Sequence, residues 1–223
     1  MMSRKLAIVV TVIVLAAAIV AAAVAVGTSD AASGSGQGSG QGNGQGNGQG
    51  AGGGGRGQGE ALGTHDAEQH VAPDTSTPLT AAEADGLTFM REEEKLARDV
   101  YTALGEQYDL RVFSNIARSE STHMAAVKDL LDAFSIPDPV GEDVAGRFED
   151  DSLAALYADL MEQGGASLDD ALRVGIAIEE KDIADLEARI AATDREDLTA
   201  VYENLLRGSE RHLQAFTRQL DRH

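Results

Sequence analysis

Apolar residues recur at every third or fourth position from about Thr80 to the end of the chain, as on one face of an α-helix. Helix-start signals accompany these stripes. Thr80 precedes Glu83 at the spacing of a capping box, and Ser167 precedes Asp170 by three residues. No window alternates apolar and polar residues over a useful length, so no strand is predicted. The pattern predicts helices at about 80–107, 112–134, 152–163, 167–192 and 194–220.

Four of these predicted helices are long, which favours an all-α domain built as a four-helix bundle. The segment between Ser135 and Ser167 separates the second long helix from the third and contains the short amphipathic helix. A segment of this length can run from one end of a bundle to the other. We therefore expect a crossover connection between the second and third long helices.

The N-terminal segment has the features of a membrane anchor. Arg4 and Lys5 precede an apolar run from Leu6 to Val26 that contains no charged residue. About 20 such residues span a bilayer as a helix. We expect 1–27 to be an uncleaved signal anchor, with a signal peptide cleaved after Ala23-Val-Ala25 as the alternative. The early positive charges place the remainder of the chain outside the cytoplasm, anchored or secreted.

The next segment, 28–80, consists largely of Gly-Ser, Gly-Gln and Gly-Asn dipeptides and holds most of the chain's 25 glycines. It cannot bury enough apolar surface to offset the entropy lost on ordering, so a disordered linker is predicted. The chain is thus divided into an N-terminal segment at 1–27, a linker at 28–80 and a helical domain at 81–223.

Composition excludes several classes of function. The net charge of −19 would repel a phosphate backbone, so nucleic-acid binding is not expected. The chain has no cysteine, which rules out disulfides, zinc fingers and thiol catalysis. The expected partners are the membrane, through the N-terminal helix, and metal ions; assembly into a homodimer is left open.

Acidic and imidazole side chains interrupt the apolar stripes of the long helices. Glu120 and His123 share one face with Ile116 and Val127. The third long helix carries Glu179 and Asp182 in the same way, the fourth carries His212, and in the first either Glu93 or Glu94 must face inward. Burying such groups together is costly unless they are protonated, paired with a base or bound to a cation.

A bound metal is the simplest compensation, because no base is evident on the stripes. Carboxylate oxygens and imidazole nitrogens suit iron, manganese or zinc, with one or two ions. The alternative is a structural network of hydrogen bonds. The candidate metal ligands are Glu94, Glu120, His123, Glu179, Asp182 and His212.

Four sequence blocks carry a resemblance to the ferritin-like superfamily and, within it, to domain of unknown function 2202 (DUF2202). The blocks are REEEKLARDVY at 91–101, FSNIARSESTH at 113–123, ALRVGIAIEEKDIADL at 171–186 and YENLLRGSERHLQAF at 202–216. The superfamily pattern implies a glutamate on the first and third helices and Glu-x-x-His on the second and fourth. The chain departs from it at Ser209, where the fourth-helix glutamate is expected, and Asp182 is the residue that could compensate.

The resemblance also implies oxidation chemistry, namely Fe(II) oxidation or reduction of oxygen or peroxide by a di-iron-type oxidoreductase. Because the site departs from the pattern at Ser209, a mononuclear or empty site is also considered. The alternative function is a non-enzymatic module for metal storage, sensing or interaction, with a degenerate site.

Overall fold

The computed structural model describes residues 71–223, which form five helices and no strand. Each helix lies within a few residues of its predicted bounds, so the all-α prediction is confirmed. The N-terminal segment and linker residues 28–70 lie outside the described residues. Within 71–223, no helix combines the length and apolarity needed to cross a bilayer. The helices are α2 Ala81–Tyr108, α3 Arg111–Ala133, α4 Asp151–Gly164, α5 Leu168–Ala191 and α6 Glu196–Leu220.

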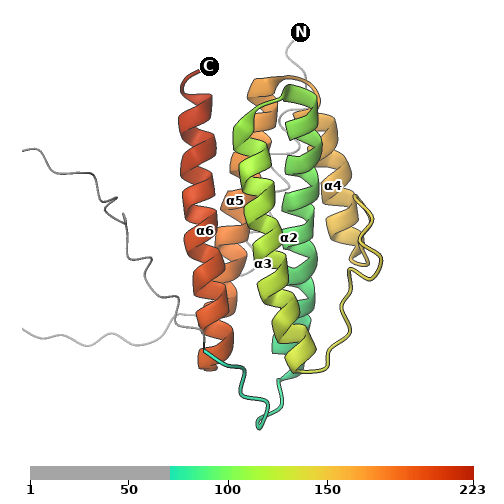
Figure 1. The fold of residues 1–223 in the computed structure, drawn as a ribbon, viewed down its shortest axis with the longest axis vertical. Helices are drawn as coiled ribbons and strands as arrows, with labels where there is room; N and C mark the ends of the chain where they lie inside the picture. The colour runs from blue at the N-terminus through green and yellow to red at the C-terminus, as the bar shows by residue number, and fades with distance from the viewer. Residues whose placement is uncertain (1–70) are drawn as a thin grey trace, which may run out of the picture. The chain divides into compact units, whose positions relative to one another are not determined.

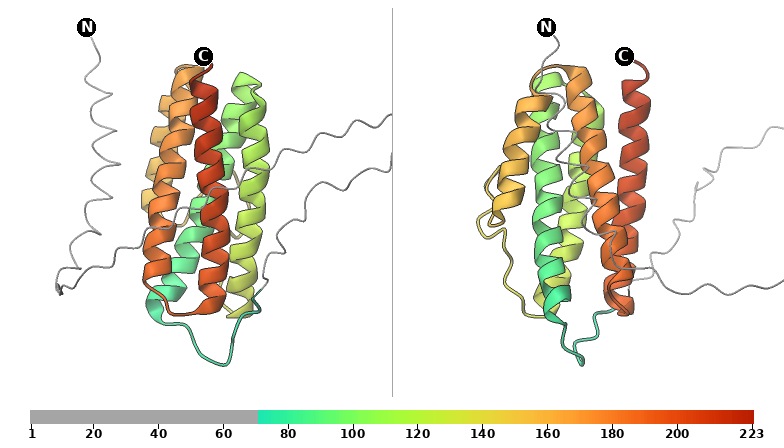
Figure 2. Two further views of the ribbon diagram at one scale, coloured as in Figure 1. Left: turned by 90° about the vertical axis from the view of Figure 1, so that its left-hand side faces the viewer. Right: turned by 180° about the vertical axis from the view of Figure 1, so that it is seen from behind.

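The four long helices form a bundle (Figure 1). Helix α2 packs against α3 and α5, and α6 packs against the same two helices from the opposite corner. The short α4 lies outside this square, against α2 and α5 (Figure 2). Helices α3 and α5 run in the same direction, so the connection between them returns along the bundle and carries α4 on its way.

The starts of α2, α4 and α5 are capped by side chains that accept hydrogen bonds from free backbone amides, whereas α3 and α6 begin without such a cap. Thr80 and Glu83 form the predicted capping box before α2. The side chain of Ser167 accepts from the amide of Asp170 before α5, and that of Asp150 accepts from the first amides of α4. Short polar sequences thus determine where these three helices begin.

The bundle interior has two apolar clusters along its length. One lies around the α2–α3 turn and contains Tyr101, Phe113 and Phe216; the other lies toward the opposite end and contains Leu87, Leu131 and other aliphatic residues. Each long helix passes from one cluster to the other, and in each at least one buried acidic or imidazole side chain lies between the two clusters. The fold therefore places one polar layer in the middle of an otherwise apolar interior.

The crossover segment is held to α2 by buried charges. Lys95 is fully buried and donates to Asp99 at 2.5 Å and to the backbone carbonyl of Val144 at 2.8 Å. Glu92 accepts hydrogen bonds from the backbone amides of Glu149 at 2.5 Å and Asp150 at 2.9 Å. The outer side of α2 thus carries a polar contact surface that fixes the path leading into α4.

Replacing Glu92 with alanine is expected to lower the free energy of unfolding by about 2 kcal/mol, because two partly buried amides lose their acceptor. Urea denaturation would measure the change. Glu106→Ala serves as a control on the same helix, because Glu106 is exposed; it should shift stability by less than about 0.5 kcal/mol. Equal stability of the two variants would contradict a role for Glu92 in fixing the crossover.

Candidate metal centre

The polar layer contains all six residues that the sequence singles out as metal ligands, and all four long helices contribute to it. Their exposed fractions range from 1% for Glu94 to 9% for His212, so the whole set is buried. Helix α2 contributes Glu94, α3 contributes Glu120 and His123, α5 contributes Glu179 and Asp182, and α6 contributes His212. Residues that are far apart in sequence therefore converge in the interior of the bundle.

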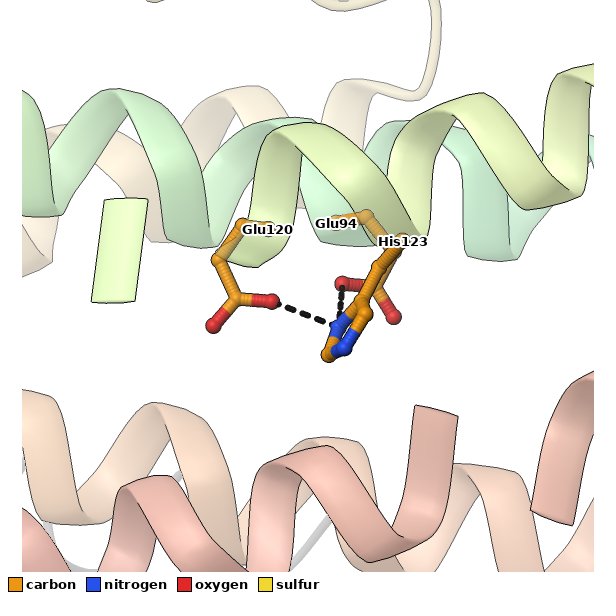
Figure 3. Close-up of side chains that lie close together, drawn as sticks. All are labelled: Glu94, Glu120 and His123. Atoms are coloured by element: carbon orange, nitrogen blue, oxygen red, sulfur yellow. Dashed lines mark hydrogen bonds and ion pairs between the residues drawn. The ribbon is translucent and has the colours of Figure 1, made fainter. Parts of the chain in front are cut away.

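Glu94, Glu120 and His123 form the first group of ligand atoms, drawn in Figure 3. The Nδ1 atom of His123 lies 2.8 Å from Glu120 Oε2 and 3.3 Å from Glu94 Oε2. One ligand atom from each residue lies within 4.8 Å of those of the other two. The group faces away from the backbones of α2 and α3 and toward α5 and α6 (Figure 3). This spacing allows one cation to contact all three side chains.

The second group consists of Glu120, Glu179 and His212 and meets the same 4.8 Å limit. The Nδ1 atom of His212 lies 2.8 Å from Glu120 Oε1 and 3.6 Å from Glu179 Oε2. The hydroxyl of Tyr101 donates to Glu179 Oε1 at 2.7 Å, which orients that carboxylate. The centres of the imidazole rings of His123 and His212 are 5.6 Å apart. Glu120 is shared by the two groups and directs one oxygen at each histidine.

Asp182 lies in the same layer but belongs to neither group. Its Oδ2 atom accepts a hydrogen bond of 2.5 Å from Ser209 Oγ, and its Oδ1 atom has no hydrogen-bond partner. Ser209 is fully buried and stands three residues before His212 on α6. The structure thus brings a carboxylate from α5 to the position on α6 where the Glu-x-x-His pattern would have its own.

Several polar atoms of the layer have no hydrogen-bond partner. They include Glu94 Oε1, Glu120 Oε1, Asp182 Oδ1 and His212 Nδ1. Glu120 Oε1 and His212 Nδ1 are only 2.8 Å apart, so alignment rather than distance prevents a hydrogen bond. Leaving buried polar atoms unsatisfied costs about 1–3 kcal/mol each. Close approach without hydrogen-bond geometry is the arrangement expected of side chains that share a cation.

Electrostatics in the layer depend on burial and on the two histidines. Burial raises the pKa of both Glu94 and Glu179 above the usual carboxyl range, and nearby histidines reverse only part of the shift. Burial acts on Glu120 in the same direction, but contacts with the two histidines outweigh it and lower its pKa. Burial by itself lowers the pKa of the two histidines, because it disfavours a charged imidazole. The neighbouring carboxylates have a larger, opposite effect and raise the pKa of His123 to about 11 and that of His212 to about 9. Protons bound to the histidines and to the buried carboxyl groups thus offset the negative charge of the cluster. A metal cation could take the place of these protons.

The run of glutamates at 92–94 is a feature that sequence reasoning interpreted only in part. Such a run usually marks a solvated face, yet all three side chains are buried. Glu94 faces the polar layer, Glu92 accepts from the crossover backbone, and Glu93 forms an ion pair with Lys181 of α5. The structure therefore places Glu94, and not Glu93, among the candidate ligands.

Gly208 is a residue of the site that sequence reasoning missed. A Cβ atom at this position would lie 2.6 Å from both Cε1 and Nε2 of His123. Only glycine leaves room for the imidazole ring against α6. A glycine inside a helix costs about 1 kcal/mol relative to alanine, so its presence in the middle of α6 was a usable signal of close packing.

Comparisons with known proteins identify the family. Residues 83–223 match the family model described as "Uncharacterized protein domain (DUF2202)", and the chain belongs to this family. The uncharacterized protein MJ0754 of Methanocaldococcus jannaschii is 53% identical over 144 residues, which cover 65% of this chain and 78% of that protein. The crystal structure of hypothetical protein MJ0754 from Methanococcus jannaschii is similar, with a TM-score of 0.66 and 51% identity over 68% of this chain and 86% of that one. Neither name states a ligand or an activity.

Proposed function

We propose that this DUF2202 protein is a ferritin-like metal protein that holds two transition-metal ions in the polar layer of its bundle. One observation carries the proposal: Glu120 directs its two carboxylate oxygens at the Nδ1 atoms of two different histidines, each at 2.8 Å. A carboxylate in this position can bridge two cations. The unsatisfied oxygen and nitrogen atoms around it supply the additional ligands.

Each metal position would have its own ligands in addition to the shared Glu120. The first position would use Glu94 and His123, and the second would use Glu179 and His212. Asp182, oriented by Ser209, would supply a further carboxylate in place of the missing fourth-helix glutamate. This set contains oxygen and nitrogen donors only, which suits iron, manganese or zinc.

Iron in such a site would supply one-electron redox chemistry. Two Fe(II) ions would give up two electrons, and dioxygen would accept them with two protons to form hydrogen peroxide. The protein's part is to hold the ligands in a dry interior and to orient Glu179 through the hydroxyl of Tyr101.

The presence of Ser209 where the pattern has a glutamate favours a second candidate, a module that stores or senses metal without turnover. Tethering outside the cytoplasm is proposed from the apolar run Leu6–Val26 alone.

Anaerobic loading of the full-length chain with Fe(II), followed by gel filtration and elemental analysis, tests metal binding. About two iron ions per chain are expected for a bridged site. Glu179→Ala should lose the second position, whereas Glu106→Ala, an exposed control on α2, should load fully. Less than about a tenth of an equivalent in the unmodified chain would remove the proposal, because such ligand sets bind transition metals readily.

A second measurement separates the enzyme from the module. Oxygen uptake that is faster than buffer autoxidation, and that is lost in His123→Ala, would favour the enzyme.

A further inference from the structure

A cavity of about 200 Å³ lies between α2, α5 and α6, away from the polar layer. Arg189, on its α5 wall, stands seven residues beyond Asp182, which is about 10 Å along the helix at 1.5 Å per residue. Leu186 and Leu205, both fully buried, belong to the apolar cluster that lies between the two sites. The cavity is therefore a separate feature. Its lining includes Glu83, Gly86, Asp185, Arg189, Leu198 and Tyr202.

The guanidinium of Arg189 is the unusual group in this cavity. Its Nε atom is buried and has no hydrogen-bond partner, and the side chain forms no ion pair within residues 71–223. The guanidinium carbon lies 5.1 Å from the centre of the Phe89 ring, which holds it in place. A Cβ atom at Gly86 would come within 3.0 Å of Arg189 Nη1, so glycine keeps room beside the guanidinium.

The two acids of the cavity wall are occupied by other donors. Glu83 Oε1 accepts from Thr193 Oγ1 at 2.6 Å, and its Oε2 accepts from the backbone amide of Thr80 at 2.8 Å. Asp185 Oδ2 accepts from Lys181 Nζ at 2.5 Å. The acids that line the cavity with Arg189 thus already have other hydrogen-bond partners. An arginine with free donors is suited to a planar carboxylate, which it can bind through two parallel hydrogen bonds.

The rest of the wall determines what kind of anion would fit. Tyr202 is 2% exposed, and its hydroxyl forms no hydrogen bond among the described residues. Leu198 and three alanines, Ala82, Ala188 and Ala192, make much of the remaining lining apolar. A phosphate dianion would face the carboxylates of Glu83 and Asp185 with only one arginine to neutralise it. A monoanion with an apolar body avoids this repulsion.

We propose that this cavity binds a small organic carboxylate, with the carboxylate on Arg189 and Tyr202 and a short apolar body against Leu198 and the alanines. The proposal is independent of metal binding, because the cavity contains none of the six candidate ligands. The ligand class follows from one free guanidinium, one free hydroxyl and an apolar wall in a space large enough for a benzoate-sized molecule.

Isothermal titration of the full-length chain with benzoate tests the proposal, with neutral benzamide as the matched comparison. Benzoate is expected to bind with a Kd of about 1 mM or tighter, and benzamide at least about 10-fold more weakly. Arg189→Met, which keeps an unbranched apolar stem but removes the guanidinium, should weaken benzoate binding by at least about 10-fold, and Tyr202→Phe by about 3-fold or more. Arg189→Lys keeps the charge but loses the planar fork, so it should also weaken binding.

Circular dichroism would confirm that each variant keeps its helices, and Glu106→Ala, an exposed change on α2 outside the cavity, should bind benzoate as the unmodified chain does. The proposal is overturned if benzoate fails to bind at millimolar concentration, or if benzamide binds equally well. It is also overturned if both folded Arg189 variants retain full affinity. Tighter binding of inorganic phosphate than of benzoate would contradict the assigned ligand class.

Discussion

Replacing Glu120 with glutamine is expected to empty both metal positions at once. Glu120 Oε2 lies 2.8 Å from His123 Nδ1, and Oε1 lies 2.8 Å from His212 Nδ1, so this carboxylate is common to both groups. Glutamine keeps the shape but has no charge and only one oxygen, and its amide group would be a donor toward one cation. Changes outside the ligand shell already weaken metal binding by about 10- to 100-fold, so the loss of a shared ligand should exceed that.

Glu94→Gln is the matched comparison, because it is the same chemical change at a residue of the first group only. It should leave the position formed by Glu120, Glu179 and His212 able to bind, so about half of the metal should remain. Elemental analysis after gel filtration would measure both variants, with circular dichroism as a check on folding. If the two variants lost the same amount of metal, Glu120 would not be a bridging residue.

The helices and their inward faces could be predicted because local rules determine them. Thr80 and Glu83 make a capping box within one turn, and the chain needs no distant partner to begin α2 there. The apolar stripes identify the buried face of each helix, and Glu120 and His123 lie on that face at a spacing of three residues. Since burial of such groups needs compensation, their chemistry could also be inferred before the fold was known.

The contacts between helices could not be predicted in the same way. The roles of Glu92, Glu93 and Glu94 depend on the path of the crossover and on where Lys181 lies on α5. Neither feature leaves a periodic signal in the sequence. The contact of Asp182 with Ser209 likewise depends on how α5 and α6 are aligned along their axes, which spacing within one helix does not reveal.

Substituting alanine for Gly208 is expected to separate the two metal positions. A Cβ atom there would lie 2.6 Å from two atoms of the His123 ring, which is too close for any real contact. The ring must therefore move, and its Nδ1 atom would leave Glu94 and Glu120. His212 does not meet this Cβ, so the second position should remain. Iron loading of the full chain should fall from about two ions to about one, as expected for the loss of one of two bridged positions.

Stability distinguishes this effect from general disruption of the helix. Alanine is favoured over glycine in a helix by about 1 kcal/mol, which offsets part of the strain from overpacking. The variant should therefore keep its helical content while it loses metal. Gly164→Ala is the control, because its Cβ would press on the methyl groups of Leu104 at 3.0 Å, within the apolar cluster and away from any candidate ligand. Full iron loading of the Gly208→Ala variant would show that His123 is not a ligand. Normal iron loading of the Gly164→Ala variant, together with reduced iron loading of the Gly208→Ala variant, would assign the first position to His123.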